Sequence, residues 1–340
     1  MYINVADVLN LASKLTFKRI NNAMRIYSSF VRSKKAGRSQ HQGLPISLSV
    51  EPTTACNLKC PECPSGLRSF TRPTGKMNAE VFNNLIDELH ETLFYLIFYF
   101  QGEPYLHPDL LKMIRYAADK NIYTATSTNA HFITQEVAEQ TVMSGLDRMI
   151  ISIDGATQET YESYRKEGKL EKVLEGTRNM VEAKKRLGKS TPHLVWQFLV
   201  VRPNEHEVGE IKKLAGEYGV NKVAFKTAQV YDYEQGNELI PTIDKYSRYR
   251  KNADGTYSAK NKMLDECWKM WHSSVVTWDG KVVPCCFDKD AHHELGNVQD
   301  VAFESVWHSQ QYEAFREQLL TSRSEIEMCK NCSEGGKVWG

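Results

Sequence analysis

The stretch ISLSVEPTTACNLKCPEC, residues 46–63, joins a short strand pattern to three closely spaced cysteines. Residues 46–52 predict a β-strand, and Cys56, Cys60 and Cys63 follow it with the spacing C-x3-C-x2-C. Three thiolates within one loop can face a single inorganic cluster. A 4Fe–4S cluster has four irons and usually takes four cysteines. Three cysteines therefore leave one iron open to a small molecule.

Outward from this stretch, strand patterns alternate with helix patterns along the chain. Six strand patterns separated by helical ones predict a parallel sheet with helices outside. Six units are fewer than the eight of a closed barrel, so the expected fold is α/β, an open partial (β/α)6 TIM-like barrel. The expected strands cover residues 46–52, 93–100, 122–127, 148–154, 193–201 and 222–228. The expected helices cover residues 78–91, 108–120, 134–144, 170–187 and 205–218.

Three further segments flank the expected barrel. The N-terminal segment has apolar residues at helical spacing and predicts one or two amphipathic helices, followed by a polar linker over residues 34–44. The C-terminal segment holds five cysteines among short elements, with turns expected at residues 278–280 and 296–297, and predicts a small metal-stapled module. The expected divisions are a helical arm and linker (1–45), the barrel (46–228), a connector without periodicity (229–262) and the module (263–340).

Composition narrows the class of protein. The chain has 340 residues, of which 41% are hydrophobic and 25% are charged, as in soluble globular proteins. No uncharged apolar stretch reaches the roughly 18 residues that a membrane span needs, and no secretory signal is visible. We therefore expect a cytoplasmic protein. Its eight cysteines are too sparse for a disulfide scaffold, and clustered thiols in a reducing compartment usually indicate metal.

Charge is concentrated in the N-terminal arm. Residues 1–40 contain eight Lys or Arg and one acid, Asp7, a net charge of +7, so the other 300 residues carry −6 of the total of +1. Three roles fit such an arm: a cap on the barrel, a site for a partner or leader peptide, or peripheral contact with an anionic membrane. The sequence lacks the basic, aromatic-interleaved strands of a nucleic-acid surface, so no nucleic-acid partner is expected.

A second set of cysteines lies in the C-terminal segment. It consists of Cys267, then Gly280-x4-Cys285, then Cys329-x2-Cys332, with Cys286 as an additional thiol. Neighbouring residues in an extended segment point in opposite directions. We therefore expect only one of the two adjacent cysteines to be a ligand.

The first cysteine loop and three later motifs together resemble the radical S-adenosylmethionine (SAM) superfamily over residues 46–228. The motifs follow the second, third and fourth expected strands, and carboxyl ends of strands are where barrel sites assemble. The sequence departs from the family pattern at Gln101 and Ala130, where glycines are common, and at Glu62, where an aromatic residue is common. The motifs are Gln101-Gly102-Glu103-Pro104, Ser127-Thr128-Asn129 and Ser152-Ile153-Asp154-Gly155, with Arg165 thirteen residues after Ser152.

The resemblance implies a 4Fe–4S cluster on Cys56, Cys60 and Cys63, with SAM bound at the open iron. It also implies an enzyme that cleaves SAM to methionine and a 5′-deoxyadenosyl radical, which abstracts a hydrogen atom from the substrate. SAM contacts are implied for Gly102, Glu103, Pro104, Thr128, Asn129, Ser152, Asp154 and Arg165.

The C-terminal cysteines resemble the SPASM or twitch extensions of such enzymes, which hold auxiliary iron–sulfur clusters. Five thiols fully ligate one cluster and not two, so one auxiliary 4Fe–4S cluster is implied. Such a cluster accepts an electron from the substrate radical or positions the substrate. The implied ligands are Cys267, Cys285, Cys329 and Cys332, and the choice between Cys285 and Cys286 stays open.

The partners remain open at this level. The family's substrates include small molecules, glycans and peptides, and its electron donors include flavodoxins and ferredoxins. No compact winged-helix pattern precedes residue 46, which weighs against a peptide substrate. The alternative is a non-catalytic zinc or iron–sulfur scaffold protein. In that case the first cysteine loop would need a fourth zinc ligand, for which His107 is a candidate, and the C-terminal cysteines would form a four-cysteine zinc knuckle.

Overall fold

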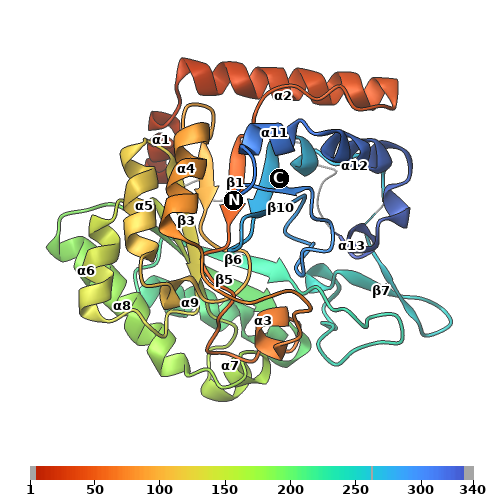
Figure 1. The fold of residues 1–340 in the computed structure, drawn as a ribbon. Coiled ribbons are helices and arrows are strands. Elements are labelled where there is room, and N and C mark those ends of the chain that lie inside the picture. The colour runs from red at the N-terminus through yellow and green to blue at the C-terminus, as the bar shows by residue number, and fades with distance from the viewer. Residues whose placement is uncertain (1–4, 262, 333–340) are drawn as a thin grey trace.

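The computed structural model describes residues 5–261 and 263–332. The parts of the expected arm, connector and C-terminal module that fall on residues 1–4, 262 and 333–340 lie outside the described residues. Figure 1 shows helices around the outside of a curved sheet, with one long helix across its end.

The six predicted strands are all present and lie parallel and in chain order within one sheet. Strand β6 is an edge of that sheet in the described chain, so the barrel is partial rather than closed. The strands are β1 (Ser47–Val50), β2 (Tyr95–Ile97), β3 (Tyr123–Thr128), β4 (Arg148–Ser152), β5 (His193–Val200) and β6 (Lys222–Thr227).

Alternate residues of each strand face the covering helices and the lumen, because side chains on a strand point to opposite faces. On β1, Leu48 and Val50 belong to the core under the helices, whereas Ser47 and Ser49 line the lumen. Most of the helices lie where the sequence predicts them. They are α4 (Ala79–Leu89), α5 (Leu110–Asp119), α6 (Gln135–Met143), α7 (Gln158–Tyr164), α8 (Leu170–Arg186) and α9 (Val208–Glu217).

The C-terminal segment extends the same sheet. Strand β9 (Ser273–Val276) pairs in parallel with β1, β10 (Lys281–Val283) pairs with β9, and β11 (Gly296–Asn297) pairs with β10. The predicted turn at residues 278–280 lies between β9 and β10. The predicted turn at 296–297 is wrong, because these residues form β11. Gly296 is needed for packing instead: a Cβ there would lie 2.8 Å from Val306 Cγ1.

Short elements complete the C-terminal half. The predicted connector contains a β-hairpin formed by β7 and β8. The sequence did not predict this hairpin, because its residues show no periodicity. Its Tyr249 hydroxyl donates to the Val230 carbonyl at 3.0 Å and so ties the hairpin to the end of the barrel. The elements are β7 (Tyr249–Lys251), β8 (Tyr257–Ala259), α10 (Lys269–His272), α11 (Phe303–Trp307), α12 (Gln310–Thr321) and α13 (Glu327–Lys330).

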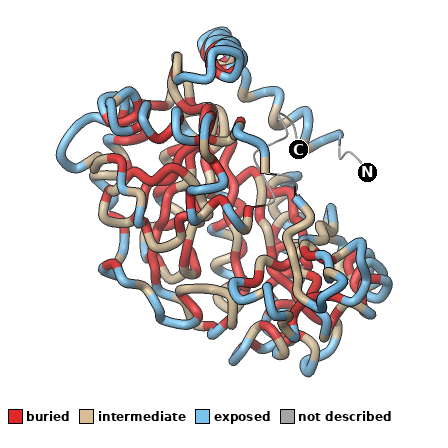
Figure 2. Tube along the Cα trace, turned by 90° about the vertical axis from the view of Figure 1, so that its right-hand side faces the viewer, coloured by how far each residue is buried: buried red, intermediate tan, exposed pale blue. Residues whose placement is uncertain are grey.

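The N-terminal arm forms two helices, α1 (Val5–Ser13) and α2 (Phe17–Ala36), as predicted. Helix α2 runs further than expected and ends at Gly37 in the left-handed conformation, so the linker begins later than residue 34. The buried Arg19 guanidinium donates to the carbonyls of His90 and Asn121, which precede β2 and β3. The arm therefore lies across the amino ends of the strands, at the edge of the molecule in Figures 1 and 2.

Candidate functional site

The first cysteine loop connects β1 to α4 at the carboxyl end of the sheet. Cys60 is buried and Cys56 and Cys63 are half-buried. The one-turn helix α3 (Pro64–Leu67) starts directly after Cys63 and folds the chain back over Cys60. Only glycine fits at position 66, because a Cβ there would lie 2.5 Å from the Cys60 amide nitrogen. The loop is therefore tightly wound around its thiols.

The surroundings of these thiols favour their neutral, protonated form. Burial raises the pKa of Cys56 to about 12 and also raises the pKa of Cys60, an effect that the neighbouring Arg165 partly offsets. Thiols become metal ligands as thiolates, so metal binding reverses this preference. No three His, Cys, Asp or Glu side chains of residues 5–261 and 263–332 converge as a single metal ion requires.

His107, the candidate fourth ligand in the zinc alternative, does not serve the cysteine loop. Both ring nitrogens of His107 are engaged elsewhere: Nε2 pairs with the Met77 carbonyl at 2.9 Å, and Nδ1 accepts from the Asp109 amide at 3.1 Å. Glu62, which departs from the family pattern, accepts from the Tyr231 amide at 2.9 Å. It therefore joins the cysteine loop to the connector.

The Gln101–Pro104 turn lies directly on the cysteine loop. The Gly102 amide donates to Ser65 Oγ at 2.9 Å, and the Glu103 amide donates to the Ala55 carbonyl at 2.7 Å. Gly102 has a φ of 74°, and a Cβ there would lie 2.2 Å from the Thr53 carbonyl oxygen. Glycine is therefore required at this close approach. Pro104 begins the short 3₁₀ helix that follows.

The Glu103 carboxylate faces the end of β3. One oxygen accepts from Thr128 Oγ1 at 2.7 Å and the other from the Asn129 amide at 2.8 Å. Burial raises the pKa of this carboxyl, and these two hydrogen bonds oppose the rise. Ala130, where the family commonly has glycine, still adopts the left-handed conformation with φ of 61°. Glu103 therefore fixes the backbone at Thr128 and Asn129.

Buried Asp154 and half-buried Arg165 form an ion pair beside Cys60. Arg165 Nε lies 2.5 Å from Asp154 Oδ2, and Arg165 Nη1 lies 3.7 Å from Cys60 Sγ. The Leu199 amide holds the other Asp154 oxygen at 2.6 Å. Burial alone would lower the pKa of Arg165, but Asp154 and Cys60 raise it well above its ordinary value. Ser152 is buried at the end of β4.

The predicted residues of the first site thus lie together at the carboxyl ends of β1 to β4. The Asn129 side chain even reaches the cysteine loop, where it donates to Asn57 Oδ1 at 2.8 Å. Within the protein, Arg165 is paired with Asp154 and Cys60, and the Glu103 carboxylate is engaged by Thr128 and Asn129.

Four of the C-terminal cysteines line one small cavity, of about 20 Å³. Cys286 does not line it; its Sγ lies 3.1 Å from Lys269 Nζ, and the residue lines the large lumen cavity instead. Cys285 borders both cavities and its thiol hydrogen-bonds with that of Cys286, but of the two only Cys285 lines the small cavity. The cysteines around the small cavity are Cys267, Cys285, Cys329 and Cys332.

Arg323 is a residue of this second site that sequence reasoning missed. Its buried guanidinium donates to the Glu266 carbonyl at 2.7 Å and lies 3.6 Å from Cys332 Sγ. Burial would lower its pKa, but the surrounding thiols raise it. No sequence pattern singles it out, because it follows α12 in an ordinary polar stretch.

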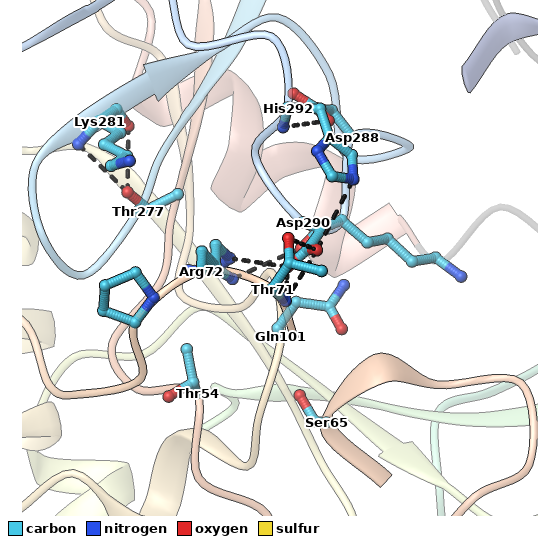
Figure 3. Close-up of polar contacts among 12 residues, drawn as sticks. Thr54, Ser65, Thr71, Arg72, Gln101, Thr277, Lys281, Asp288, Asp290 and His292 are labelled. Atoms are coloured by element: carbon cyan, nitrogen blue, oxygen red, sulfur yellow. Dashed lines mark hydrogen bonds and ion pairs between the residues drawn. The ribbon is translucent and has the colours of Figure 1, made fainter. Parts of the chain in front are cut away.

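The chain after the cysteine loop is tied to the C-terminal segment, where Thr71 and Arg72 lie against Asp290 (Figure 3). Arg72, in the chain after the cysteine loop, binds both carboxylate oxygens of Glu51 at 2.8 and 2.6 Å. The adjacent Thr71 amide donates to Asp290 Oδ2 at 2.9 Å, and the Trp278 amide donates to Glu51 at 3.2 Å. We call Glu51, Thr71, Arg72, Trp278 and Asp290 the clamp. It ties the first cysteine loop to the C-terminal segment.

A lumen cavity of about 1320 Å³ connects the ends of the barrel. At the amino end of the strands it is lined by Ile20 and Met24 of α2, and at the carboxyl end by Phe100 of the chain after β2. Cys285 and Cys286 line its wall. The cavity is therefore large enough for a substrate and reaches the second cysteine site.

Comparison with known proteins identifies two domains. The profile of the Radical SAM superfamily matches residues 50–224, and that of the SPASM iron-sulfur cluster-binding domain matches residues 267–333. Mycofactocin maturase MftC of Mycobacterium tuberculosis is 26% identical over 311 residues, 85% of this chain and 75% of that protein. PqqA peptide cyclase of Bradyrhizobium diazoefficiens is 25% identical over 328 residues, 88% of this chain and 81% of that protein.

Solved structures share the fold. Streptococcus suis SuiB bound to S-adenosylmethionine has a TM-score of 0.64 at 14% identity, covering 92% of this chain and 77% of SuiB. BtrN in complex with AdoMet and 2-DOIA has a TM-score of 0.52 at 19% identity, covering 86% of this chain and 94% of BtrN.

Proposed function

The chain belongs to the radical SAM superfamily and carries a SPASM iron–sulfur cluster-binding domain, and from this premise we propose which residues serve its chemistry. Cys56, Cys60 and Cys63 would hold the SAM-binding 4Fe–4S cluster. When bound, such a cluster supplies an electron to SAM, which yields methionine and the 5′-deoxyadenosyl radical that takes hydrogen from a substrate. The observation that carries this assignment is the meeting of the cysteine loop with three strand-end motifs at one end of the sheet.

The strand-end residues would bind and orient SAM around the open cluster position. Gly102 allows the backbone to approach closely, and Pro104 fixes the turn that follows it. Glu103 would act by holding Thr128 and Asn129 in place. Ser152 and Asp154 would contact the carboxylate or ribose of SAM, and Arg165 would supply positive charge beside Cys60 and the SAM carboxylate.

The second site would hold one auxiliary 4Fe–4S cluster. Four cysteines around one small cavity match the usual four-thiolate ligation, and Arg323 adds a positive charge that favours thiolates. The proposed ligands are Cys267, Cys285, Cys329 and Cys332. The role of this site would be to accept an electron from the substrate radical or to position the substrate.

The substrate would occupy the lumen cavity, which Cys285 and Cys286 of the C-terminal segment border. Two similar proteins bear on its class: one is named a PqqA peptide cyclase, and SuiB has a structure bound to precursor peptide SuiA. These relatives support a peptide substrate. The sequence analysis weighed against one, because no compact winged-helix pattern precedes residue 46. A small molecule or glycan remains compatible with the cavity volume. A flavodoxin or ferredoxin would supply electrons, in the cytoplasm.

The proposed domain division keeps the barrel at residues 46–228, the connector at 229–262 and the module at 263–340. The module would share the sheet with the barrel through the β1–β9 pairing. The arm and linker, residues 1–45, would cover the amino ends of the strands.

Anaerobic reconstitution followed by incubation with SAM and dithionite tests the proposal. The wild-type chain should release 5′-deoxyadenosine, measured by liquid chromatography and mass spectrometry. The triple variant Cys56→Ala/Cys60→Ala/Cys63→Ala should release none while it keeps about four irons, those of the auxiliary site. A colourless zinc-loaded wild-type protein, or a triple variant that loses no iron relative to wild type, would favour the non-catalytic scaffold.

A further inference from the structure

Helix α1 is oriented with its polar side toward the protein and its apolar side outward. Asp7 accepts from the Tyr123 hydroxyl and pairs with Arg148, and Asn10 donates to Asp147 at 2.8 Å. Val5 and Leu9 are 67% and 64% exposed, and α1 has no buried residue. A helix on a water-facing surface normally buries its apolar side. The outward side of α1 is therefore built for an apolar surrounding.

Helix α2 carries a second apolar face besides the one that packs on the protein. Its inner side is buried through residues such as Ile26 and Phe30. The outer stripe recurs at every third or fourth position, so its members share one face of the helix, and all are at least 44% exposed. Phe17 at its start is 82% exposed. The stripe consists of Phe17, Ile20, Met24, Tyr27 and Val31.

Exposed cations accompany the stripe. Arg25, Arg32, Lys35 and Arg38 are exposed and form no ion pair with any acid among the described residues. The arm's acid, Asp7, is engaged by Arg148 and its side chain is only 9% exposed. The outer face of the arm is therefore apolar and cationic, without a compensating negative charge.

The stripe also borders the open end of the lumen cavity. Ile20, Met24 and Tyr27 line that cavity as well as being exposed. Trp268 lines it too, and its ring packs against Tyr27 with centroids 5.9 Å apart. The apolar surface thus continues from the outside of the arm into the barrel.

We propose that the α1–α2 arm binds the surface of an anionic lipid bilayer, with the stripe inserted among the lipids and the mouth of the lumen facing them. A basic, amphipathic helical surface has the charge and apolar area that such binding needs. A second copy of the chain fits poorly, because a symmetric contact would bring together the exposed cations of two arms, including Arg25, Arg32, Lys35 and Arg38. No helix of the described residues is long and apolar enough to cross a membrane, so contact is limited to the surface.

Vesicle flotation of the reconstituted full-length protein tests the proposal. The protein should float with vesicles of phosphatidylcholine and phosphatidylglycerol and remain unbound with phosphatidylcholine alone. Phe17→Ser should weaken binding about tenfold, the lower end of what burying an aromatic side chain contributes. Arg25→Glu/Arg32→Glu should weaken it at least about fivefold for each lost cation. Met143→Ser, which removes a 59% exposed apolar side chain from α6, is the matched control and should bind like wild type.

Release of 5′-deoxyadenosine without substrate should be equal in all these variants, which confirms that they are folded. Flotation does not depend on this activity, so a chain that releases none can still bind vesicles. The proposal is overturned by equal binding of wild type and Phe17→Ser, or by equal binding to the two vesicle types. Sedimentation that shows a dimer dissolved by Phe17→Ser, without vesicle binding, would assign the stripe to a second copy of the chain.

Discussion

Each proposed cluster site has one arginine beside a cysteine, half-buried Arg165 at the first site and buried Arg323 at the second. Arg165 Nη1 lies 3.7 Å from Cys60 Sγ, and Arg323 Nη2 lies 3.6 Å from Cys332 Sγ. A nearby guanidinium favours the thiolate form that metal ligation requires. The two arginines are themselves held by Asp154 and by backbone carbonyls. Both sites therefore hold a guanidinium beside a thiol before any cluster binds.

At the scale of single residues, Glu103→Ala should weaken SAM binding while the iron content stays unchanged. The carboxylate touches no cysteine and holds Thr128 and Asn129, so its loss disorders the proposed SAM contacts. A hydrogen bond to a charged group contributes roughly 1.5–3 kcal/mol, which is about tenfold to hundredfold in affinity. Calorimetric titration of SAM measures this. Glu88→Ala is the control, because Glu88 also accepts two backbone amides; equal effects in both would contradict the prediction.

The two adjacent cysteines of the second site should behave differently. Cys285 lines the cavity that the other three cysteines share, whereas Cys286 lies against Lys269. Cys285→Ala should therefore lose the iron and the electron paramagnetic resonance signal of the auxiliary cluster, and Cys286→Ala should keep both. The reverse result would show that Cys286 is the ligand.

At the scale of elements, the clamp should contribute strongly to stability. The Arg72 and Glu51 side chains are 4% and 0% exposed, so Arg72→Met leaves a carboxylate buried without its partner. Such a change destabilises by about 3–5 kcal/mol, measurable by anaerobic chemical denaturation. Arg72→Met/Glu51→Gln should recover part of the loss. Lys213→Met, which removes an exposed pair with Glu217, should cost at most about 1 kcal/mol. A loss from Arg72→Met no larger than this would contradict the prediction.

The elements also show what sequence patterns can and cannot predict. The six barrel strands were predictable because apolar runs such as residues 93–100 alternate with amphipathic helices. Strand β11 was not, because Gly296-Asn297 has turn composition and is extended only by pairing with β10. The cysteine loop was predictable from the local spacing of its three cysteines. Arg323 and the clamp were not, because their roles depend on contacts between distant segments. The outward apolar side of α1 could not be foreseen, because periodicity does not say which face meets the protein.

At the scale of the whole molecule, His41 links the arm, α10 and α11. Its Nε2 pairs with the Trp271 carbonyl at 3.0 Å and its ring packs edge-on against Trp307. Burial, helped by Arg316, lowers the pKa of His41 to about 2. The folded protein therefore keeps this histidine neutral at pH values where the unfolded chain, with an ordinary pKa near 6.5, binds a proton.

The sign of the effect follows from this difference. The stabilising contribution is complete above pH 6.5 and is lost as the pH falls, because only the unfolded state gains the proton. Between pH 7.5 and 5.5 the wild type should lose about 1.4 kcal/mol more unfolding free energy than His41→Phe does. Anaerobic denaturation at the two pH values measures the difference. Equal losses in the two proteins would show that His41 does not remain neutral.

The shared sheet determines how far damage at the second site should spread. Cys332→Ala removes one proposed ligand from a cavity that joins α13 to the chain before α10 and after β10, so these segments should exchange amide hydrogens faster. Strand β9 is paired with β1 as well as β10, so it should stay protected, as measured by hydrogen exchange and mass spectrometry. Substrate turnover should be lost while 5′-deoxyadenosine release continues, because the first cysteine loop is intact. Exchange that also rises throughout β9 would mean that the SPASM segment unfolds as a unit despite its place in the barrel sheet.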